Sequence, residues 1–266
     1  MTKLLHADLT YRLRGIGFQI HNELGPGHDE ADYETALAYA MTRDDISFVR
    51  QPVYQINYRG QQVGEYRPDV MLAGGAVVLD LKATTTIEPL HKAQVLSYMA
   101  VTKAELGLIM NFGAASLQVE RLPNFLANRQ PQQNFVTPLP DGLYPELTRR
   151  LLDSLFTVQR SLGPGFLHQI YRRATRIELS HNQMNYAYLK ELPLRFQGQT
   201  ITQKETRLFW IEECILLATV ALAQVTHVHT EKLRWALRET GCPLGLIANF
   251  YPSQLEVRFI RLAATT

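Results

Sequence analysis

The sequence contains little cysteine, no long apolar run and no excess of one charge. Its two cysteines, Cys214 and Cys242, are too few for a cysteine-only zinc site or a four-cysteine iron–sulfur cluster. No stretch approaches the roughly 18 apolar residues that a membrane-spanning helix needs, and the amino-terminal residues lack the apolar region of a signal peptide. We therefore expect a cytoplasmic protein with reduced thiols and no membrane partner.

The overall composition is that of a globular protein. Of 266 residues, 46% are hydrophobic and 20% are charged, which excludes a disordered, collagen-like or low-complexity chain. The 27 basic residues nearly balance the 25 acidic ones, so no global positive field indicates a nucleic-acid partner. Any surface that binds an anionic partner must be local.

The chain repeats one pattern at a constant spacing of 138 residues. The anchors that share this spacing are LGPG at 24–27 and 162–165, Tyr33 and Tyr171, Gly60-Gln61 and Gly198-Gln199, and LGLIMNF at 106–112 and LGLIANF at 244–250. Four separated anchors with one offset indicate a tandem duplication without net insertion. We predict a first domain at 1–126, a Pro-, Gln- and Asn-rich linker at 127–144 and a second domain at 145–266.

Apolar periodicity in the first copy predicts helices and strands in a fixed order. The expected helices are 9–24, 29–45 and 89–103, and the expected strands are 48–58, 63–72, 76–81, 106–111 and 117–122. This order predicts an α/β fold, with a mixed central sheet flanked by helices in each of two tandem domains.

One expected strand carries charged residues at a spacing that suggests chemistry. Asp80 and Lys82 are two residues apart, so both side chains project to the same face of the strand. Asp69 ends the preceding strand, and pairing of the two strands would bring it to the same place. A divalent cation would offset the cost of burying these groups, because Asp69, Asp80 and the backbone carbonyl of Leu81 offer hard oxygen ligands for Mg²⁺. The alternative is a structural Asp80–Lys82 ion pair on an exposed edge strand.

Five motifs in the first copy together resemble the GxxExxY protein family of the PD-(D/E)XK nuclease superfamily. They are Gly27-x-x-Glu30-x-x-Tyr33, Tyr66-Arg67-Pro68-Asp69, Asp80-Leu81-Lys82-Ala83, Gln94-x-x-x-Tyr98 and Gly107-Leu108-Ile109-Met110-Asn111-Phe112. The resemblance covers residues 9–122 in order. Asp80 stands where the family more often has glutamate, which is one methylene longer.

The resemblance implies a Mg²⁺- or Mn²⁺-dependent nuclease. It implies Asp69, Asp80 and the Leu81 carbonyl as metal ligands, and Lys82 as the catalytic lysine that assists attack by water. It also implies Glu30 as an acidic, metal-binding member of the site and Gln94 as a polar site residue. Complementing a helix dipole is the alternative role for Glu30, and packing at the sheet rim is the alternative for Gln94 and Tyr98.

The second copy lacks every one of these groups. Where the first has Glu30, Asp69, Asp80, Lys82, Gln94 and Tyr98, the second has His168, Arg207, Ala218, Val220, Lys232 and Ala236. We therefore predict a degenerate domain without a metal site. The residues that we expect to contact nucleic acid are Tyr98, Arg172, Arg173, Arg207 and Lys232, with a solvated helix face as the alternative for Arg172 and Arg173.

The sequence thus predicts a nuclease that acts on nucleic acid, with DNA as the first candidate. The inactive copy would support the active one as an internal pseudo-dimer. The sequence does not decide whether two such chains also form a homodimer. A non-catalytic nucleic-acid-binding or scaffolding protein with a vestigial site is one alternative, and a metal-dependent hydrolase of small phosphoesters is another.

Overall fold

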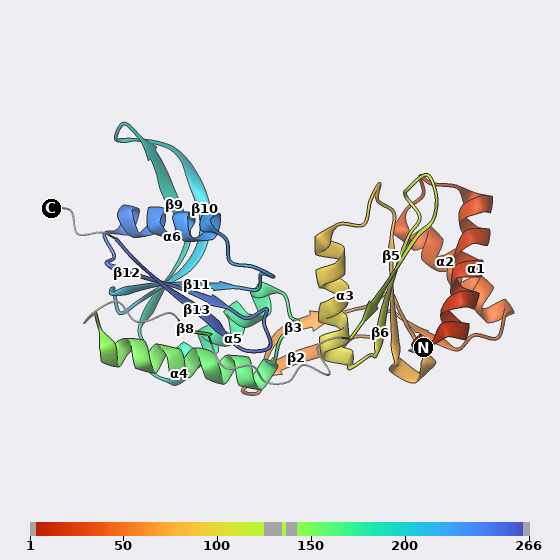
Figure 1. The fold of residues 1–266 in the computed structure, drawn as a ribbon, viewed down its shortest axis with the longest axis horizontal. Coiled ribbons are helices and arrows are strands. Elements are labelled where there is room, and N and C mark those ends of the chain that lie inside the picture. The colour runs from red at the N-terminus through yellow and green to blue at the C-terminus, as the bar shows by residue number, and fades with distance from the viewer. Residues whose placement is uncertain (1–3, 125–134, 137–142, 263–266) are drawn as a thin grey trace. The chain divides into compact units, whose positions relative to one another are not determined.

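The computed structural model describes residues 4–124, 135–136 and 143–262, and it divides into two compact units (Figure 1). The first unit comprises Met1–Asn57, Gln62–Arg129 and Gly165–Leu167, and the second comprises Tyr58–Gln61, Gln130–Pro164 and His168–Thr266. Most of the predicted linker at 127–144 lies outside the described residues. No helix in the described part of the chain is long and apolar enough to cross a membrane.

The first repeat is a mixed sheet between helices. Its helices are α1 (Ala7–Leu24), α2 (Glu30–Arg43) and α3 (Pro89–Thr102). Its strands are β1 (Phe48–Arg50), β2 (Tyr54–Tyr58), β3 (Gln61–Tyr66), β4 (Val70–Leu72), β5 (Val77–Lys82), β6 (Leu106–Asn111) and β7 (Gln118–Pro123), with a 3-10 turn η1 (Ala73–Gly75) before β5. The sheet order is β1-β4-β5-β6-β7, in which only β5 and β6 are parallel, and β2 and β3 form a separate ribbon.

The second repeat has equivalent helices and core strands, and it adds one short strand. Its helices are α4 (Pro145–Leu162), α5 (His168–His181) and α6 (His227–Thr240). Its strands are β8 (Phe135–Val136), β9 (Tyr186–Phe196), β10 (Gln199–Ile211), β11 (Ile215–Val220), β12 (Leu244–Asn249) and β13 (Glu256–Arg261), in the sheet order β8-β13-β12-β11-β10-β9. All three helices lie 138 residues after α1, α2 and α3, and β11, β12 and β13 lie 138 residues after β5, β6 and β7. The fold is therefore two tandem α/β domains, as the sequence predicts.

The residues that survive in both copies stabilise the fold in the same way. The Tyr33 hydroxyl donates to the carbonyl oxygen of Gly25 at 2.7 Å, and its ring stacks on Phe112 with centroids 4.6 Å apart. In the second repeat, Tyr171 donates to the equivalent turn at 2.7 Å and stacks on Phe250 at 4.5 Å. Each tyrosine thus joins the LGPG turn to the phenylalanine that directly follows β6 or β12.

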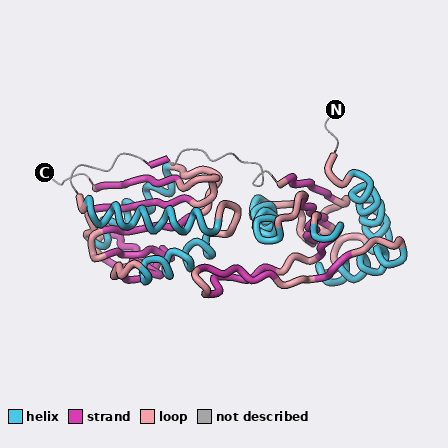
Figure 2. The backbone as a smooth tube through the Cα atoms, turned by 90° about the horizontal axis from the view of Figure 1, so that it is seen from below, coloured by secondary structure: helices cyan, strands magenta, loops and turns pink. Residues whose placement is uncertain are grey.

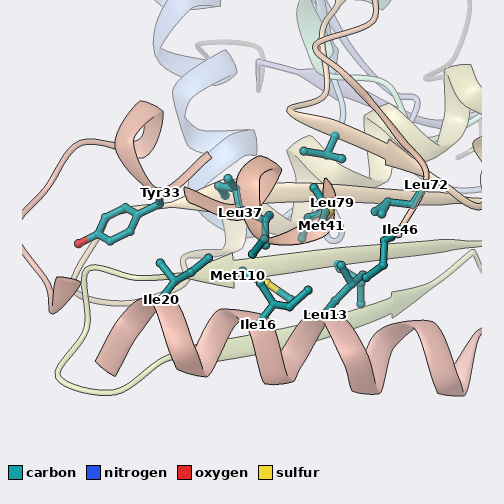
Figure 3. Close-up of a cluster of buried hydrophobic side chains, with 14 of the residues drawn as sticks. Leu13, Ile16, Ile20, Tyr33, Leu37, Met41, Ile46, Leu72, Leu79 and Met110 are labelled. Atoms are coloured by element: carbon teal, nitrogen blue, oxygen red, sulfur yellow. The ribbon is translucent and has the colours of Figure 1, made fainter. Parts of the chain in front are cut away.

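Helices α1 and α2 pack on one face of the first sheet, and α3 lies across the other face (Figures 1 and 2). Figure 3 shows the core between the sheet and α1 and α2, which contains Leu13, Ile16, Ile20, Leu37, Met41, Leu79 and Met110. Because successive strand residues point to opposite faces, Val77, Leu79 and Leu81 enter this core. Asp80 and Lys82 therefore face the α3 side.

Two predicted strands of the first repeat were wrong as single elements. The segment predicted at 48–58 is divided into β1 and β2 around Pro52, and the segment at 63–72 is divided into β3 and β4 around Pro68. Proline has no N–H for the strand ladder and restricts its neighbours. The second repeat has Lys190 and Thr206 at these positions, and there the strands continue as β9 and β10.

Candidate functional site

The charged residues of the central strands meet at one end of the first sheet. Strand β4 pairs antiparallel with β5, with Val70 opposite Leu79. This register continues to place Asp69 opposite Asp80. The pairing agrees with the sequence prediction, and it puts two carboxylates on adjacent strands.

Asp80 and Lys82 form a buried pair. The Lys82 Nζ atom lies 2.7 Å from Asp80 Oδ2 and donates to the Leu81 carbonyl oxygen at 2.9 Å. Asp80 is only 1% exposed and Lys82 is 7% exposed, so the exposed edge pair considered from the sequence is wrong. Lys82 is the partner that the structure gives the Asp80 carboxylate, and neither carboxylate oxygen accepts a further hydrogen bond from a described residue. The buried carboxylate therefore keeps acceptor capacity that the ion pair does not use.

Both carboxylates have raised affinities for a proton. Burial raises the pKa of Asp80 to about 7, and the neighbouring Asp69 charge adds to this against the opposing effect of Lys82. Burial also raises the pKa of Asp69, although the Leu81 N–H donates to its Oδ2 atom at 2.7 Å. Two adjacent acids that are costly to ionise form a place where a cation is favoured.

Two acids on α2 lie near these groups. Glu30, the first residue of α2, has Oε2 4.0 Å from Lys82 Nζ, and its Oε1 accepts from the Ala83 N–H at 3.4 Å. Its side chain is 48% exposed, so it stands at the rim. Sequence reasoning missed Glu34, which is buried and accepts hydrogen bonds at 2.8 Å from both Arg50 and Gln51. The spacing of Glu30 and Glu34, four residues apart on one helix, is the signal that would have found it.

Helix α3 carries two polar residues on the face of the sheet to which Asp80 points, the face that α1 and α2 do not cover. Gln94 Nε2 donates to the Tyr98 hydroxyl at 2.6 Å, as their shared helix face predicts. Burial and then the Asp80 charge raise the pKa of Tyr98. Tyr66, which sequence analysis did not assign, packs its ring against Tyr98 at 5.7 Å in an edge-on arrangement. Gln94 therefore reaches the site through Tyr98.

The donor set fits a hard divalent cation. Among the described residues, no three His, Cys, Asp or Glu side chains converge closely enough to hold a metal ion. Mg²⁺ does not require three, because it usually keeps several waters and binds one or two carboxylates. The Asp80 carboxylate, the adjacent Asp69 carboxylate and the Leu81 carbonyl are such ligands. The metal-binding role of Glu30 stays a prediction.

The two equivalent histidines, His91 and His229, close the starts of their helices. His91 Nδ1 accepts from the Glu88 N–H at 3.1 Å, and His229 Nδ1 accepts from the Thr226 N–H at 3.1 Å. Each histidine is the third residue of its helix and completes a capping box. These contacts give both residues a structural role.

Replacing Asp80 by asparagine is expected to stabilise the metal-free protein at pH 7.5. The folded-state pKa of about 7 exceeds the unfolded value of about 3.9, so the folded state holds more protons between these values. The contribution of Asp80 to the free energy of unfolding therefore falls as pH rises from about 4 to about 7. We expect Asp80→Asn to gain on the order of 2 kcal/mol at pH 7.5 and much less at pH 4.5. Thermal unfolding with chelator at both pH values measures this, and an equal loss of stability at both would contradict it.

Comparison with known proteins identifies the pattern that both repeats share. The PD-(D/E)XK nuclease superfamily pattern matches residues 7–122 and 145–262. No curated protein matches the sequence. Three solved chains match, and one of them, titled "Crystal structure of SSO0001", is 16% identical with a TM-score of 0.30. The similarity covers 35% of the present chain and 50% of that chain, so it spans half the length of the solved protein.

Proposed function

Because the chain belongs to the PD-(D/E)XK nuclease superfamily, with one matching segment in each repeat, we propose that its first repeat is a Mg²⁺- or Mn²⁺-dependent phosphodiesterase. Its substrate would be a nucleic acid, and DNA is the first candidate. The second repeat would be inactive. The observation that carries this proposal is the convergence of three buried or half-buried charged groups, because the Asp80 carboxylate pairs with Lys82 at 2.7 Å and lies on the strand next to Asp69.

The chain's own residues have separable roles in this proposal. Asp69 and Asp80 would hold the cation, which when bound would neutralise charge on the phosphate and lower the pKa of a bound water. Lys82 places an ammonium 2.7 Å from Asp80, where it would orient the attacking water and oppose the negative charge that develops on the phosphate. Gln94 and Tyr98 form a hydrogen-bonded pair on the α3 side of the sheet, where they would contact the substrate.

The second repeat presents none of these ligands. At the positions equivalent to Asp80 and Lys82 it has Ala218 and Val220, and β11 pairs with β10 and β12 as β5 pairs with β4 and β6. The backbone is therefore preserved while the ligand oxygens are gone, which supports an inactive copy. The domain limits 1–126 and 145–266 and the arrangement of the repeats as an internal pseudo-dimer remain proposals.

A panel of substrates tests the function directly. Full-length protein is incubated with linear duplex DNA, circular duplex DNA, single-stranded DNA and RNA, each with Mg²⁺, Mn²⁺ or chelator. We expect cleavage of at least one polymer with metal and none with chelator. Cleavage only of a small phosphodiester such as bis-p-nitrophenyl phosphate would favour the small-substrate alternative. No cleavage of any substrate would favour the scaffold alternative and contradict the proposal.

A further inference from the structure

In the second repeat, two adjoining cavities occupy the region that corresponds to the candidate metal site. The larger has a volume of about 510 Å³ and is lined by residues of β10, β11 and α6, including Leu208, Ala218, Val220, Trp235 and Ala236. The smaller has a volume of about 240 Å³ and is lined by His168, Arg172 and Arg207 among others. The two cavities are adjacent, since both linings include Glu205, Thr206, Ala218 and Val220.

The larger cavity exists because the second repeat has smaller side chains than the first. Ala236 takes the place of Tyr98, which removes an aromatic ring from the helix face. Ala218 and Val220 replace the longer Asp80 and Lys82, and both remain partly exposed in a position where the first repeat is buried. The volume falls within the range of about 300–1,000 Å³ that is usual for ligand sites.

The walls of this cavity suit a flat ring. Trp235 offers an aromatic surface, and its buried indole N–H has no acceptor among the described residues. Leucine, valine and alanine side chains form most of the remaining wall. An aromatic side chain in an apolar cleft is the usual platform for stacking a nucleobase.

The smaller cavity has the opposite charge to its counterpart in the first repeat. Where the first repeat has the acids Glu30, Glu34 and Asp69, the second has His168, Arg172 and Arg207. Arg172 lies near the start of α5, where the helix dipole also favours an anion, and Arg207 lies on β10. In place of carboxylates that would hold a cation, the second repeat thus presents guanidinium groups that would hold a phosphate directly.

In the smaller cavity, the guanidinium of Arg172 has an N–H group that no described residue accepts and that could donate to an anion. Arg172 donates to the Tyr188 hydroxyl at 3.3 Å, but its buried Nε atom has no partner in the described part of the chain. Arg207 pairs with Glu205 at 2.5 Å and is 47% exposed. It has a φ of 52° at an irregularity between Glu205 and Leu208 on β10, and such bulges redirect side chains. Burial and then Arg172 and Arg207 lower the pKa of His168, as expected in a positive environment.

Two lysines add positive charge at the larger cavity. Lys204 and Lys232 line it, both are exposed, and neither pairs with a carboxylate among the described residues. Glu231, which also lines the cavity, is already paired with Arg234 and with His227 at 3.2 Å. The unpaired charges beside the apolar wall are therefore both positive.

We propose that the second repeat binds one unpaired nucleotide of a single-stranded nucleic acid. Its phosphate would lie against Arg172 and Arg207, and its base would enter the apolar cavity beside Trp235. A base within a duplex is stacked and paired, so only an unpaired or extruded base enters such a cavity. The site acts by binding alone, and it rests on the proposed nuclease function only for the source of its ligand.

Binding of labelled oligonucleotides to the full-length protein tests this site. Fluorescence anisotropy is measured with chelator, so that no strand is cut, using a single-stranded DNA and the duplex of the same sequence. We expect the single strand to bind at least about tenfold more tightly than the duplex, and to quench tryptophan fluorescence in the wild type but much less in Trp235→Phe. Lys204→Ala and Lys232→Ala should each lower the slope of log affinity against log salt by about 0.7.

Two variants distinguish binding at this site from nonspecific electrostatic binding to the protein surface. Ala236→Tyr installs the residue that the first repeat carries at this position and fills the cavity, and Arg207→Ala removes a phosphate contact. Each should weaken single-strand binding by roughly tenfold or more. Ala236 is only 1% exposed, so Ala236→Tyr is compared with the wild type well below its own thermal midpoint, whereas Arg207→Ala should leave the midpoint unchanged. Arg238→Ala removes an exposed charge of α6 outside both cavities, and it should change binding by less than about threefold.

Three results would overturn this site: equal binding of duplex and single strand, unchanged binding by Ala236→Tyr, or occupation of the cavity by a fatty-acid anion such as laurate without binding of the oligonucleotide. The cleavage panel is independent of these results. Single-strand binding with the expected variant effects but without cleavage would uphold this site and contradict the proposed function. Metal-dependent cleavage with no effect of Ala236→Tyr on binding would uphold the proposed function and contradict this site.

Discussion

Replacing Lys82 or Asp80 by alanine is expected to lower metal-dependent cleavage by roughly 10²- to 10⁴-fold. The reason is that Lys82 supplies the only ammonium within 4 Å of Asp80 among the described residues, and Asp80 supplies a carboxylate that is 1% exposed on the strand next to Asp69. Positioned acids, bases and charge stabilisers typically contribute rate factors of about this size. Initial rates with the best substrate of the panel, at saturating Mg²⁺ or Mn²⁺, measure the effect.

A matched surface variant provides the control. Asp153 lies on α4 of the second repeat with a side chain that is 66% exposed, and Asp153→Ala removes a carboxylate without touching the site. We expect this variant to cleave at the wild-type rate. Lys82→Ala and Asp80→Ala should still bind single-stranded DNA, because that binding is assigned to the second repeat. Full cleavage by either site variant would place the chemistry elsewhere.

The substitution Gly113→Ala is expected to destabilise the first repeat by about 3 kcal/mol or more. A Cβ atom at Gly113 would lie 2.4 Å from the Ala83 carbonyl carbon and 2.5 Å from the Thr84 nitrogen. Because both neighbours are backbone atoms directly after Lys82, the chain cannot relax without displacing the end of β5. We expect the midpoint of the first thermal transition to fall by about 10 °C, and cleavage to fall with it.

Gly15 offers a comparison within the same repeat. It lies in α1, and a Cβ atom there would have no heavy atom within 4 Å. Gly15→Ala should therefore raise stability by up to about 1 kcal/mol through helix propensity alone. Circular dichroism melting of the two variants measures the contrast. Equal midpoints for both would show that the backbone near Gly113 has more room than the structure indicates.

The duplication and most elements followed from the sequence because they depend on local patterns. The constant offset of 138 residues defines both repeats, and periodicity predicted α1, α2, α3, β5, β6 and β7 to within a few residues. Asp80 and Lys82 were predicted to share a face because strand geometry requires it. Gln94 and Tyr98 lie on one helix face because they are four residues apart, and the structure joins them by a hydrogen bond.

The remaining features depend on contacts that one sequence does not reveal. Pro52 and Pro68 each interrupt a segment whose apolar pattern predicts a single strand, because proline lacks the N–H that a strand ladder needs. The burial of Glu34 depends on Arg50 and Gln51, which belong to another element. The cavity beside Trp235 depends on the small side chain of Ala236, which stands where the first repeat has Tyr98. Whether that smaller side chain leaves a cavity depends on how α6 packs against the sheet.

The first repeat should hold the cation and the second should not, because only the first presents Asp69 and Asp80. Isothermal titration calorimetry of Mn²⁺ into the full-length protein, compared between the wild type and Asp80→Ala, measures this difference. We expect the wild type to bind Mn²⁺ with measurable heat and Asp80→Ala to lose that binding while keeping its fold. Equal binding by both proteins would place the cation outside the pair formed by Asp69 and Asp80 and contradict the proposed site.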